Sequence, residues 1–323
     1  MKPTIPKLRK ETNVTKIHEE HLIDDYAWIK QKNWQEVLKK PKNLNPEVQH
    51  YLEAENNYTQ SNLQSLDSLK EEIFKELKNR IKDKDTSVPM KDGEYFYYTE
   101  YEEGSEYPCY KRINSQKKIE TIFDAPERAK NQKFFSLASL AHSHNHQYIA
   151  YNIDKNGSEN YFLSVENLQD QKIITSEIPN TTGEIIWDPN NTIIYYIGLD
   201  HNQRPNKIYQ HHIGDDFTKD KIIFEEKNPA FFCSVSLSQS KKFLLIRTAD
   251  HQTSEYYLKD LSNLNSSLIL FSPRIEKEEY EIDHSENYFY ILTNQSKAKN
   301  FKIMICDEKN FSRKLERFYT LSK

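Results

Sequence analysis

A cluster of four apolar or aromatic residues recurs along most of the chain. The clusters begin at residues 95, 148, 193, 243 and 288, so that 53, 45, 50 and 45 residues separate consecutive starts. A second strand pattern begins 14–15 residues after each start, around Tyr110, Phe162, Ile208, Tyr257 and Lys302. Repeats of this length, with several short strands and polar turns, are typical of β-propeller blades. The pattern therefore predicts a mainly β fold with about five blades.

Helical patterns precede the first of these clusters. Asn45 is the expected N-cap of one helix and Pro46 its first residue, because the Asn side chain accepts a backbone hydrogen bond and Pro has a fixed φ. A second helix is expected to begin with Asp67 as its N-cap. This helix has an apolar stripe at helical spacing, formed by Leu69, Ile73, Leu77 and Ile81.

The change of pattern divides the chain near residue 85. Residues 1–44 are mixed and partly irregular, the helical stretches follow, and short strands with polar turns fill the remainder. We expect an N-terminal extension with two helices at 1–84 and a β-propeller at 85–323. Propellers avoid exposed sheet edges by closing into a ring. Five blades form either a small closed ring or an interrupted ring with an open edge beside the last blade.

The hydrophobic fraction of 36% is low for a globular chain, but the charges are those of an ordinary protein surface. The net charge is −4 with basic and acidic residues interspersed, which argues against nucleic acid or an anionic membrane as a partner. No run of 18 apolar residues predicts a transmembrane helix, and the N-terminus lacks the apolar segment of a secretory signal. Cys109, Cys233 and Cys306 are scattered and fit thiols in a reducing compartment. We therefore expect a cytoplasmic protein.

The glycines exclude several classes of enzyme. Only six are present, and the closest two, Gly93 and Gly104, are eleven residues apart. A nucleophile elbow, a P-loop and a dinucleotide fingerprint all need closely spaced glycines, because the backbone turns sharply or approaches a phosphate there. A serine hydrolase of the α/β type, a kinase and a Rossmann enzyme are therefore not expected within this sequence.

The histidines offer two candidate metal sites, each with a simpler interpretation. His142, His144 and His146 alternate, so an extended chain would place three imidazoles on one face, as zinc or copper requires. They also occupy a predicted turn, where polar residues are expected in any case, and this interpretation is favoured. His18 and His21 resemble a zincin motif, but their spacing of three residues differs from the helical spacing of four.

The remaining candidates are also better explained by structure. The three cysteines fall at strand positions and are expected to be buried, inert thiols. Acidic pairs such as Glu53 with Glu55 and Glu71 with Glu72 fit solvated helix faces. Aromatic residues recur at equivalent blade positions, and the 21 Tyr and 16 Phe predict a core built more from rings than from aliphatic side chains. No catalytic, cofactor-binding or metal-binding residue is therefore predicted, and no cofactor is expected.

A family resemblance spans most of the sequence. It is carried near the N-terminus by residues 25–29 (DYAWI), 46–48 (PEV), 51–52 (YL) and 55–58 (ENNY). Further matches follow in unbroken order to about residue 305, at 87–89, 104–107, 213–214, 220–221, 224–226, 253–255, 273–274, 280, 283–284 and 300–301. These residues resemble the N-terminal part of the prolyl oligopeptidase family of serine peptidases, in its oligopeptidase B (protease II) branch. Their order and span are more specific than any single match.

The resemblance implies a cytosolic peptidase of two parts. A seven-bladed propeller covers an α/β-hydrolase domain and admits only short peptides, and cleavage follows Arg or Lys. The catalytic triad and the carboxylates that bind the basic side chain lie in the hydrolase domain. The N-terminal helices pack on that domain, so without it their apolar stripes are expected to lack their usual partner.

This sequence departs from the family pattern because it ends after about five blades. No catalytic residue of the family falls on a position here, so the resemblance implies an unclosed propeller that is inactive alone, the product of a split or truncated gene. The expected partner is a separately encoded α/β-hydrolase chain, with oligopeptides as substrates only in that complex. The alternative is a stand-alone, closed propeller that acts as a binding module. An autonomous enzyme is disfavoured, because no compact group of nucleophile, base and oxyanion donors is visible.

Overall fold

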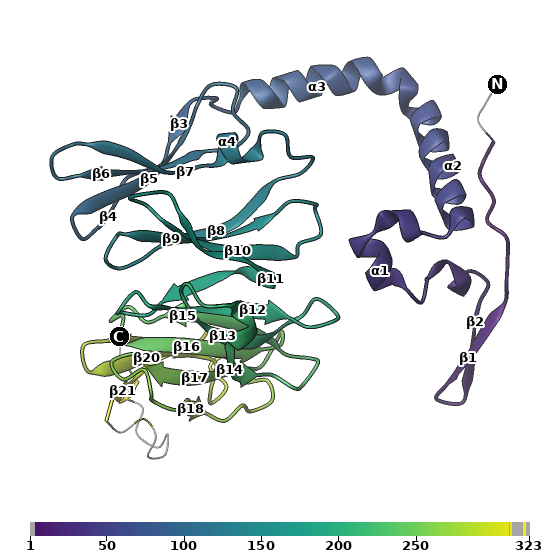
Figure 1. Ribbon diagram of the computed structural model, residues 1–323. Coiled ribbons are helices and arrows are strands. Elements are labelled where there is room, and N and C mark those ends of the chain that lie inside the picture. Colours follow the sequence, from purple (N-terminus) through teal and green to yellow (C-terminus); the bar gives the residue numbers. More distant parts are fainter. Residues whose placement is uncertain (1–3, 310, 312–318, 321–323) are drawn as a thin grey trace. The chain divides into compact units, whose positions relative to one another are not determined.

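The computed structural model describes residues 4–309, 311 and 319–320 (Figure 1). The chain forms two compact units. The first contains the N-terminal residues up to Asp92 together with Phe96–Pro108, and the second contains Gly93–Tyr95 and the residues from Cys109 onward. Each unit is described separately below.

The first unit is mainly helical. It contains a β-hairpin, three α-helices and three 3-10 helices: β1 (Asn13–Ile17), β2 (Glu20–Asp24), η1 (Ala27–Ile29), α1 (Trp34–Lys39), η2 (Pro41–Asn43), α2 (Pro46–Leu63), η3 (Gln64–Leu66) and α3 (Asp67–Asn79). The strands β3 (Asp85–Thr86), β4 (Met90–Asp92) and β5 (Tyr95–Tyr101) follow. The sequence pattern indicated none of the elements before α2. The hairpin is exposed along both strands, which gives it no alternating pattern to detect.

The two predicted helices are present, and one predicted cap is wrong. Asn45 caps α2, because its side chain accepts a hydrogen bond of 2.8 Å from the backbone N–H of Glu47, and Pro46 is the first helical residue. Asp67 does not cap α3. It lies inside the first turn, and the cap position belongs to Leu66, which follows directly from η3. Because the chain is already helical before α3, its first N–H groups need no side-chain acceptor.

The second unit consists of antiparallel sheets. Its strands are β6 (Cys109–Asn114), β7 (Ile119–Asp124), β8 (Ser136–His142), β9 (Tyr148–Asp154), β10 (Tyr161–Asn167), β11 (Ile173–Trp187), β12 (Ile193–Leu199), β13 (Pro205–His212), β14 (Lys221–Glu225), β15 (Phe232–Leu237), β16 (Phe243–Ala249), β17 (Ser254–Asp260), β18 (Ile269–Ser272), β19 (Tyr280–Ser285), β20 (Tyr288–Thr293), β21 (Lys302–Asp307) and β22 (Tyr319–Thr320). Two short helices, α4 (Ala125–Ala129) and η4 (Phe217–Lys219), lie in connections. All five predicted clusters are strands, namely β5, β9, β12, β16 and β20.

These strands form propeller blades, numbered here after the predicted clusters. Blade 4 is the sheet β15–β18 and blade 5 is the sheet β19–β22. Blades 2 and 3 form one seven-stranded sheet, because both use the fifteen-residue strand β11. The first part of β11 pairs with β10, where Ile178 faces Leu163, and its last part pairs with β12, where Ile185 faces Tyr196. Blade 2 is therefore β8 to β11, and blade 3 is β11 to β14.

The core lies between successive blades. In β16, Leu244 and Ile246 belong to a buried apolar cluster shared with blade 3. The alternate side chains, Phe243 and Leu245, belong to a cluster shared with blade 5. The strand is therefore apolar on both faces, which explains why the repeats appear as unbroken apolar clusters in the sequence. We call the face of a blade that is directed to the following blade its forward face.

Aliphatic side chains fill more of this core than aromatic rings, so the predicted dominance of rings is wrong. Among the largest fully buried side chains, Tyr195, Phe123 and Phe289 are aromatic, and the other nine are Ile or Leu. A buried tyrosine brings a hydroxyl group that needs a partner, and the hydroxyl of Tyr195 has none among the described residues. Many rings are therefore only partly buried.

Phe289 provides a test of the packing between blades 4 and 5. Its side chain is fully buried, whereas the adjacent Tyr288 is 41% exposed. Phe289→Ala is expected to lower the free energy of unfolding by about 3–5 kcal/mol, because it leaves a cavity between two sheets. Tyr288→Ala is the matched control, with an expected loss of less than about 1 kcal/mol. Urea unfolding of both variants measures the difference, and equal losses would contradict this packing.

Candidate functional site

The three alternating histidines do not share one extended face. His142 ends β8, and the following turn brings His146 back beside it with a left-handed φ of 60°. The two imidazole rings stack with centroids 5.5 Å apart. The Nε2 atom of His144 is buried without a hydrogen-bond partner among the described residues. His144 and His146 lie in the turn after β8, as the favoured interpretation predicted, whereas His142 belongs to the strand itself.

The zincin-like pair and the cysteines also occupy structural positions. His18 lies in the turn between β1 and β2, with a φ of 49°, and His21 lies in β2, so no helix presents the two imidazoles together. All three cysteines are buried. Burial raises the pKa of the Cys233 and Cys306 thiols to about 12, so both stay protonated at neutral pH and are poor nucleophiles.

A threonine, a histidine and an aspartate form a relay between blades 2 and 3. The Nε2 atom of His211 lies 3.0 Å from the Thr175 hydroxyl, and its Nδ1 atom lies 2.6 Å from a carboxylate oxygen of Asp220. This is the order of groups in a serine-hydrolase triad. Thr175 is only 3% exposed, however, and its hydroxyl oxygen also accepts a hydrogen bond from the Gly214 N–H. The relay is therefore closed to a substrate and links two blades.

A second relay connects blades 4 and 5. The hydroxyl of Ser240 lies 2.8 Å from Nδ1 of His284, whose Nε2 lies 3.1 Å from a carboxylate oxygen of Glu308. Ser240 is exposed, whereas His284 is fully buried. Acyl transfer also needs N–H donors directed at an oxyanion. At this turn the N–H groups of Ser240 and Lys241 donate instead to the carbonyl oxygens of His284 and Ser238. These two N–H groups are therefore not available to form an oxyanion hole at the second relay.

Neither relay is predicted by the sequence pattern. Thr175 and His211 are 36 residues apart, and Ser240 and His284 are 44 residues apart, with the members of each pair on different blades. Only the stacking of blades brings them together. The available signal was modest. The separation of Ser240 and His284 is close to the repeat period of 45–53 residues, so polar residues one period apart are candidates for contact between blades, but the separation of Thr175 and His211 is shorter than that period.

Arg274 is the centre of an ionic network at the connection between blades 4 and 5. Its guanidinium group lies 2.6 Å from Glu226, which follows β14, and 2.8 Å from Glu255 of β17. The side chains of both glutamates are less than 10% exposed. The guanidinium group also lies 4.0 Å from the centre of the Phe231 ring. Arg274 therefore connects blade 3, blade 4 and the segment that leads to blade 5.

The electrostatics of this network follow from burial and pairing. Burial alone would raise the pKa of the Glu226 carboxyl, but hydrogen bonds from Thr248 and Arg274 outweigh it and lower that pKa below its ordinary value. A carboxyl group with a lowered pKa in the folded state stabilises the fold above its unfolded pKa. That contribution is lost as the pH falls through the folded value.

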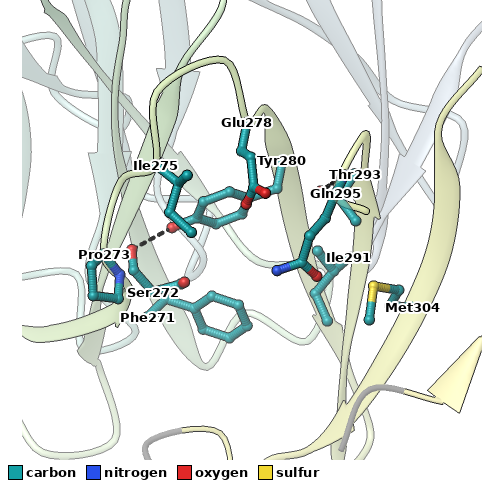
Figure 2. A pocket seen from close by; sticks show the side chains of 10 residues that line it. All are labelled: Phe271, Ser272, Pro273, Ile275, Glu278, Tyr280, Ile291, Thr293, Gln295 and Met304. Atoms are coloured by element: carbon teal, nitrogen blue, oxygen red, sulfur yellow. Dashed lines mark hydrogen bonds between the residues drawn. The ribbon is translucent and has the colours of Figure 1, made fainter. Parts of the chain in front are cut away.

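Three hollows of the second unit are not lined by residues of the relays. Figure 2 shows a small cavity between β18 and blade 5, where the hydroxyl of Tyr280 donates to the carbonyl oxygen of Ser272 over 2.8 Å. Its volume of about 20 Å³ has room for about one water molecule. Two open hollows measure about 430 Å³, beside Tyr290, and about 610 Å³, beside Arg112. None of the three is lined by Thr175 or Ser240.

In the first unit, the apolar stripe of the second helix is exposed. Its four predicted members are 46–70% exposed: Leu69, Ile73, Leu77 and Ile81. The neighbouring Phe74 is 60% exposed. No helix in the described part of the chain combines the length and apolar character needed to cross a bilayer.

The fold first defines a class of protein, an unclosed β-propeller, and its polar clusters connect neighbouring blades. A family model described as the N-terminal β-propeller domain of prolyl oligopeptidase matches residues 6–318. The chain belongs to the prolyl oligopeptidase family, and it forms the N-terminal propeller part of such a protein, as the motifs predicted.

The relatives place this propeller within longer proteins. Protease 2 of Moraxella lacunata is 28% identical over 320 residues, which cover 96% of this chain and 45% of that protein. Dipeptidyl aminopeptidase BI of Pseudoxanthomonas mexicana is 24% identical and is covered to 44%. The structure of oligopeptidase B from Leishmania major, at 24% identity, has the same fold with a TM-score of 0.88 over 98% of this chain and 46% of that one. The chain thus spans less than half the length of these relatives.

Removal of Arg274 tests the ionic network. Arg274→Met is expected to lower the free energy of unfolding at pH 7 by about 3 kcal/mol, because two buried carboxylates lose their partner. The loss should shrink as the pH falls toward 4, since the lowered pKa of Glu226 in the wild type depends in part on Arg274 and its contribution to stability is lost at low pH. Lys172→Met is the control, because its ion pair with Asp170 is exposed and contributes less than about 1 kcal/mol. A pH-independent difference between Arg274→Met and wild type in urea unfolding would contradict the network.

Proposed function

We propose that these residues are the gating propeller of an oligopeptidase B-type serine peptidase. The peptidase hydrolyses short peptides after Arg or Lys in the cytoplasm, and the propeller limits access to its active site. The nucleophile, its general base and the carboxylates that bind the basic side chain belong to an α/β-hydrolase domain outside these residues. That domain is supplied by a separate chain or by the remainder of the same protein.

One observation carries the proposal. The match to the family propeller runs from residue 6 to 318, while the same residues cover only 45% of Protease 2 of Moraxella lacunata. The structure adds support, because the two hydroxyl–imidazole–carboxylate relays are used between blades. One of them is buried, and the other has its nearest backbone N–H groups bound to carbonyl oxygens.

The exposed apolar surfaces favour this proposal over a stand-alone binding module. The stripe of α3 in the first unit and the last blade in the second unit both present large apolar side chains to solvent, among them Phe74 and Leu292. A protein that works alone is expected to cover such surfaces.

The proposal predicts that the 323-residue protein has no peptidase activity. Incubation with a fluorophosphonate probe should label no serine, and a fluorogenic peptide with Arg before the scissile bond should not be hydrolysed. A chimera should gain both properties when the 323 residues are followed by the part of Moraxella lacunata Protease 2 outside the match. Intact Protease 2 is the positive control.

Two outcomes would overturn this proposal. Hydrolysis of the peptide by the 323-residue protein would show that it carries its own catalytic machinery. If label is found, Ser240→Ala shows whether the exposed relay is responsible, because the control Ser236→Ala removes another exposed hydroxyl group without disturbing His284. A well-folded chimera that stays inactive would also contradict the proposal.

A further inference from the structure

Arg247 lies at the interface between blades 4 and 5. It belongs to β16 and is on the same side of that strand as Phe243 and Leu245, which pack on blade 5. Its neighbours in the sheet are Ser234 of β15 and Tyr256 of β17, and Tyr256 belongs to the same apolar cluster. Arg247 therefore places a positive charge on the forward face of blade 4, beside apolar side chains.

The side chain of Arg247 has no polar partner in the part of the chain that the structure describes. It is half-buried, and its Nε atom is buried without a hydrogen bond. The other described arginines of the second unit each pair with a carboxylate: Arg112, Arg128, Arg204 and Arg274. A charge that is partly removed from water without a partner costs free energy. Arg247 therefore indicates an anionic partner outside these residues.

A negative charge lies near Arg247 without pairing with it. Burial raises the pKa of the Tyr256 hydroxyl to about 12, the positive charge of Arg247 opposes this rise, and the negative charge of Glu281 adds to it. Both charges are therefore close to Tyr256, although no ion pair joins them within the described residues. Glu281 belongs to β19, the first strand of blade 5, and is exposed. The interface thus carries a cation and an anion that are separated from each other.

An open hollow adjoins Arg247. Its volume is about 430 Å³, within the range of ligand sites, and its lining includes Leu245, Ser236 and Glu281. Leu245 precedes Arg247 on the same side of β16 and is paired with Ser236 of β15. The strands β15 and β19 are the first strands of their blades, which border the central channel in a propeller. Arg247 is therefore next to a space that a small ligand can enter.

We propose that Arg247 binds the C-terminal carboxylate of the short peptides that enter the propeller. This inference rests on the proposed function. A guanidinium group can donate two parallel hydrogen bonds to a carboxylate, and every peptide with a free C-terminus carries one. Peptides that are cleaved after Arg or Lys also carry a positive charge, for which Glu281 is the complementary group. Arg247 therefore favours peptides with a free C-terminus over amidated peptides.

A carboxylate of the hydrolase domain is a less suitable partner. Buried residues of the cluster between blades 4 and 5 flank Arg247, so a partner reaches it most directly from the hollow. A flexible peptide can enter such a space, whereas a folded domain would have to insert a side chain. A carboxylate of that domain would also stay in place when the peptide is amidated, so the two partners give different results.

Peptide kinetics of the Protease 2 chimera test this role. An internally quenched peptide with one Arg before the scissile bond is prepared with a free C-terminal carboxylate and with a C-terminal amide. In Arg247→Met, the ratio of kcat/KM for the acid to that for the amide should fall about ten-fold, because hydrogen bonds to a charged group are lost. Arg247→Lys keeps the charge and should recover part of the ratio. Lys172→Met removes an exposed positive charge and is the matched control, with an unchanged ratio.

The outcome of these kinetics separates the inference from the proposed function. A chimera that hydrolyses both peptides with the same ratio in wild type and Arg247→Met would overturn the inference, although the proposed function would stand. A purely structural role of Arg247 would lower both values alike and also leave the ratio unchanged.

A second measurement uses the 323-residue protein and needs no activity. The Nε–H NMR signal of Arg247 is identified by its loss in Arg247→Lys. It should shift when acetyl-Ala-Arg with a free carboxylate is added, but not when the amide of the same dipeptide is added. A shift with inorganic phosphate and none with the peptide acid would contradict a peptide site. An inactive chimera would count against the proposed function, and this measurement would still decide the role of Arg247.

The stability of Arg247→Met distinguishes binding from a structural role. In the 323-residue protein the melting temperature should stay the same or rise, because the substitution removes a half-buried charge that has no partner in the described residues. A fall of about 4 °C or more would show that Arg247 stabilises the interface between the blades, and the inference would then be wrong.

Discussion

Apolar packing between neighbouring blades is the interaction on which the second unit depends. Each sheet has two apolar faces, so no blade can bury its own surface. A strand such as β16 contributes Leu244 to one interface and Phe243 to the next. Stability is therefore shared between neighbours, as in other repeat architectures, where terminal units need a cap or a further unit. Blade 5 shows the consequence of an interface with no neighbour in these residues.

Polar groups fix the position of one blade relative to the next within this apolar packing. The hydrophobic effect has no preferred direction, whereas a hydrogen bond between blades requires a particular geometry. His211 links blades 2 and 3 through Thr175, and His284 links blades 4 and 5 through Ser240. Arg274 extends the same principle with charge. These groups resemble catalytic constellations because fixing an imidazole between a hydroxyl and a carboxylate needs the same contacts in both settings.

The sequence predicted the repeated strands because burial on both faces leaves unbroken apolar clusters. It also predicted α2, where Asn45 and Pro46 form a local signal that depends on no distant residue. It did not predict the hairpin β1–β2, whose residues are exposed throughout, nor the role of Leu66 at the start of α3. Both relays escaped detection because their members meet only after blades stack. Features that depend on neighbouring residues in the sequence could be predicted, whereas contacts between different repeats could not.

The strand β11 has a mechanical consequence for the propeller. Because its fifteen residues run without a break through two sheets, blades 2 and 3 share backbone hydrogen bonds as well as side-chain packing. Separating them would require breaking the strand itself, whereas blades 4 and 5 belong to separate sheets that are linked by side-chain packing and by single backbone hydrogen bonds such as that from Ser240 to His284. Blades 2 and 3 are therefore joined more firmly than two blades that belong to separate sheets.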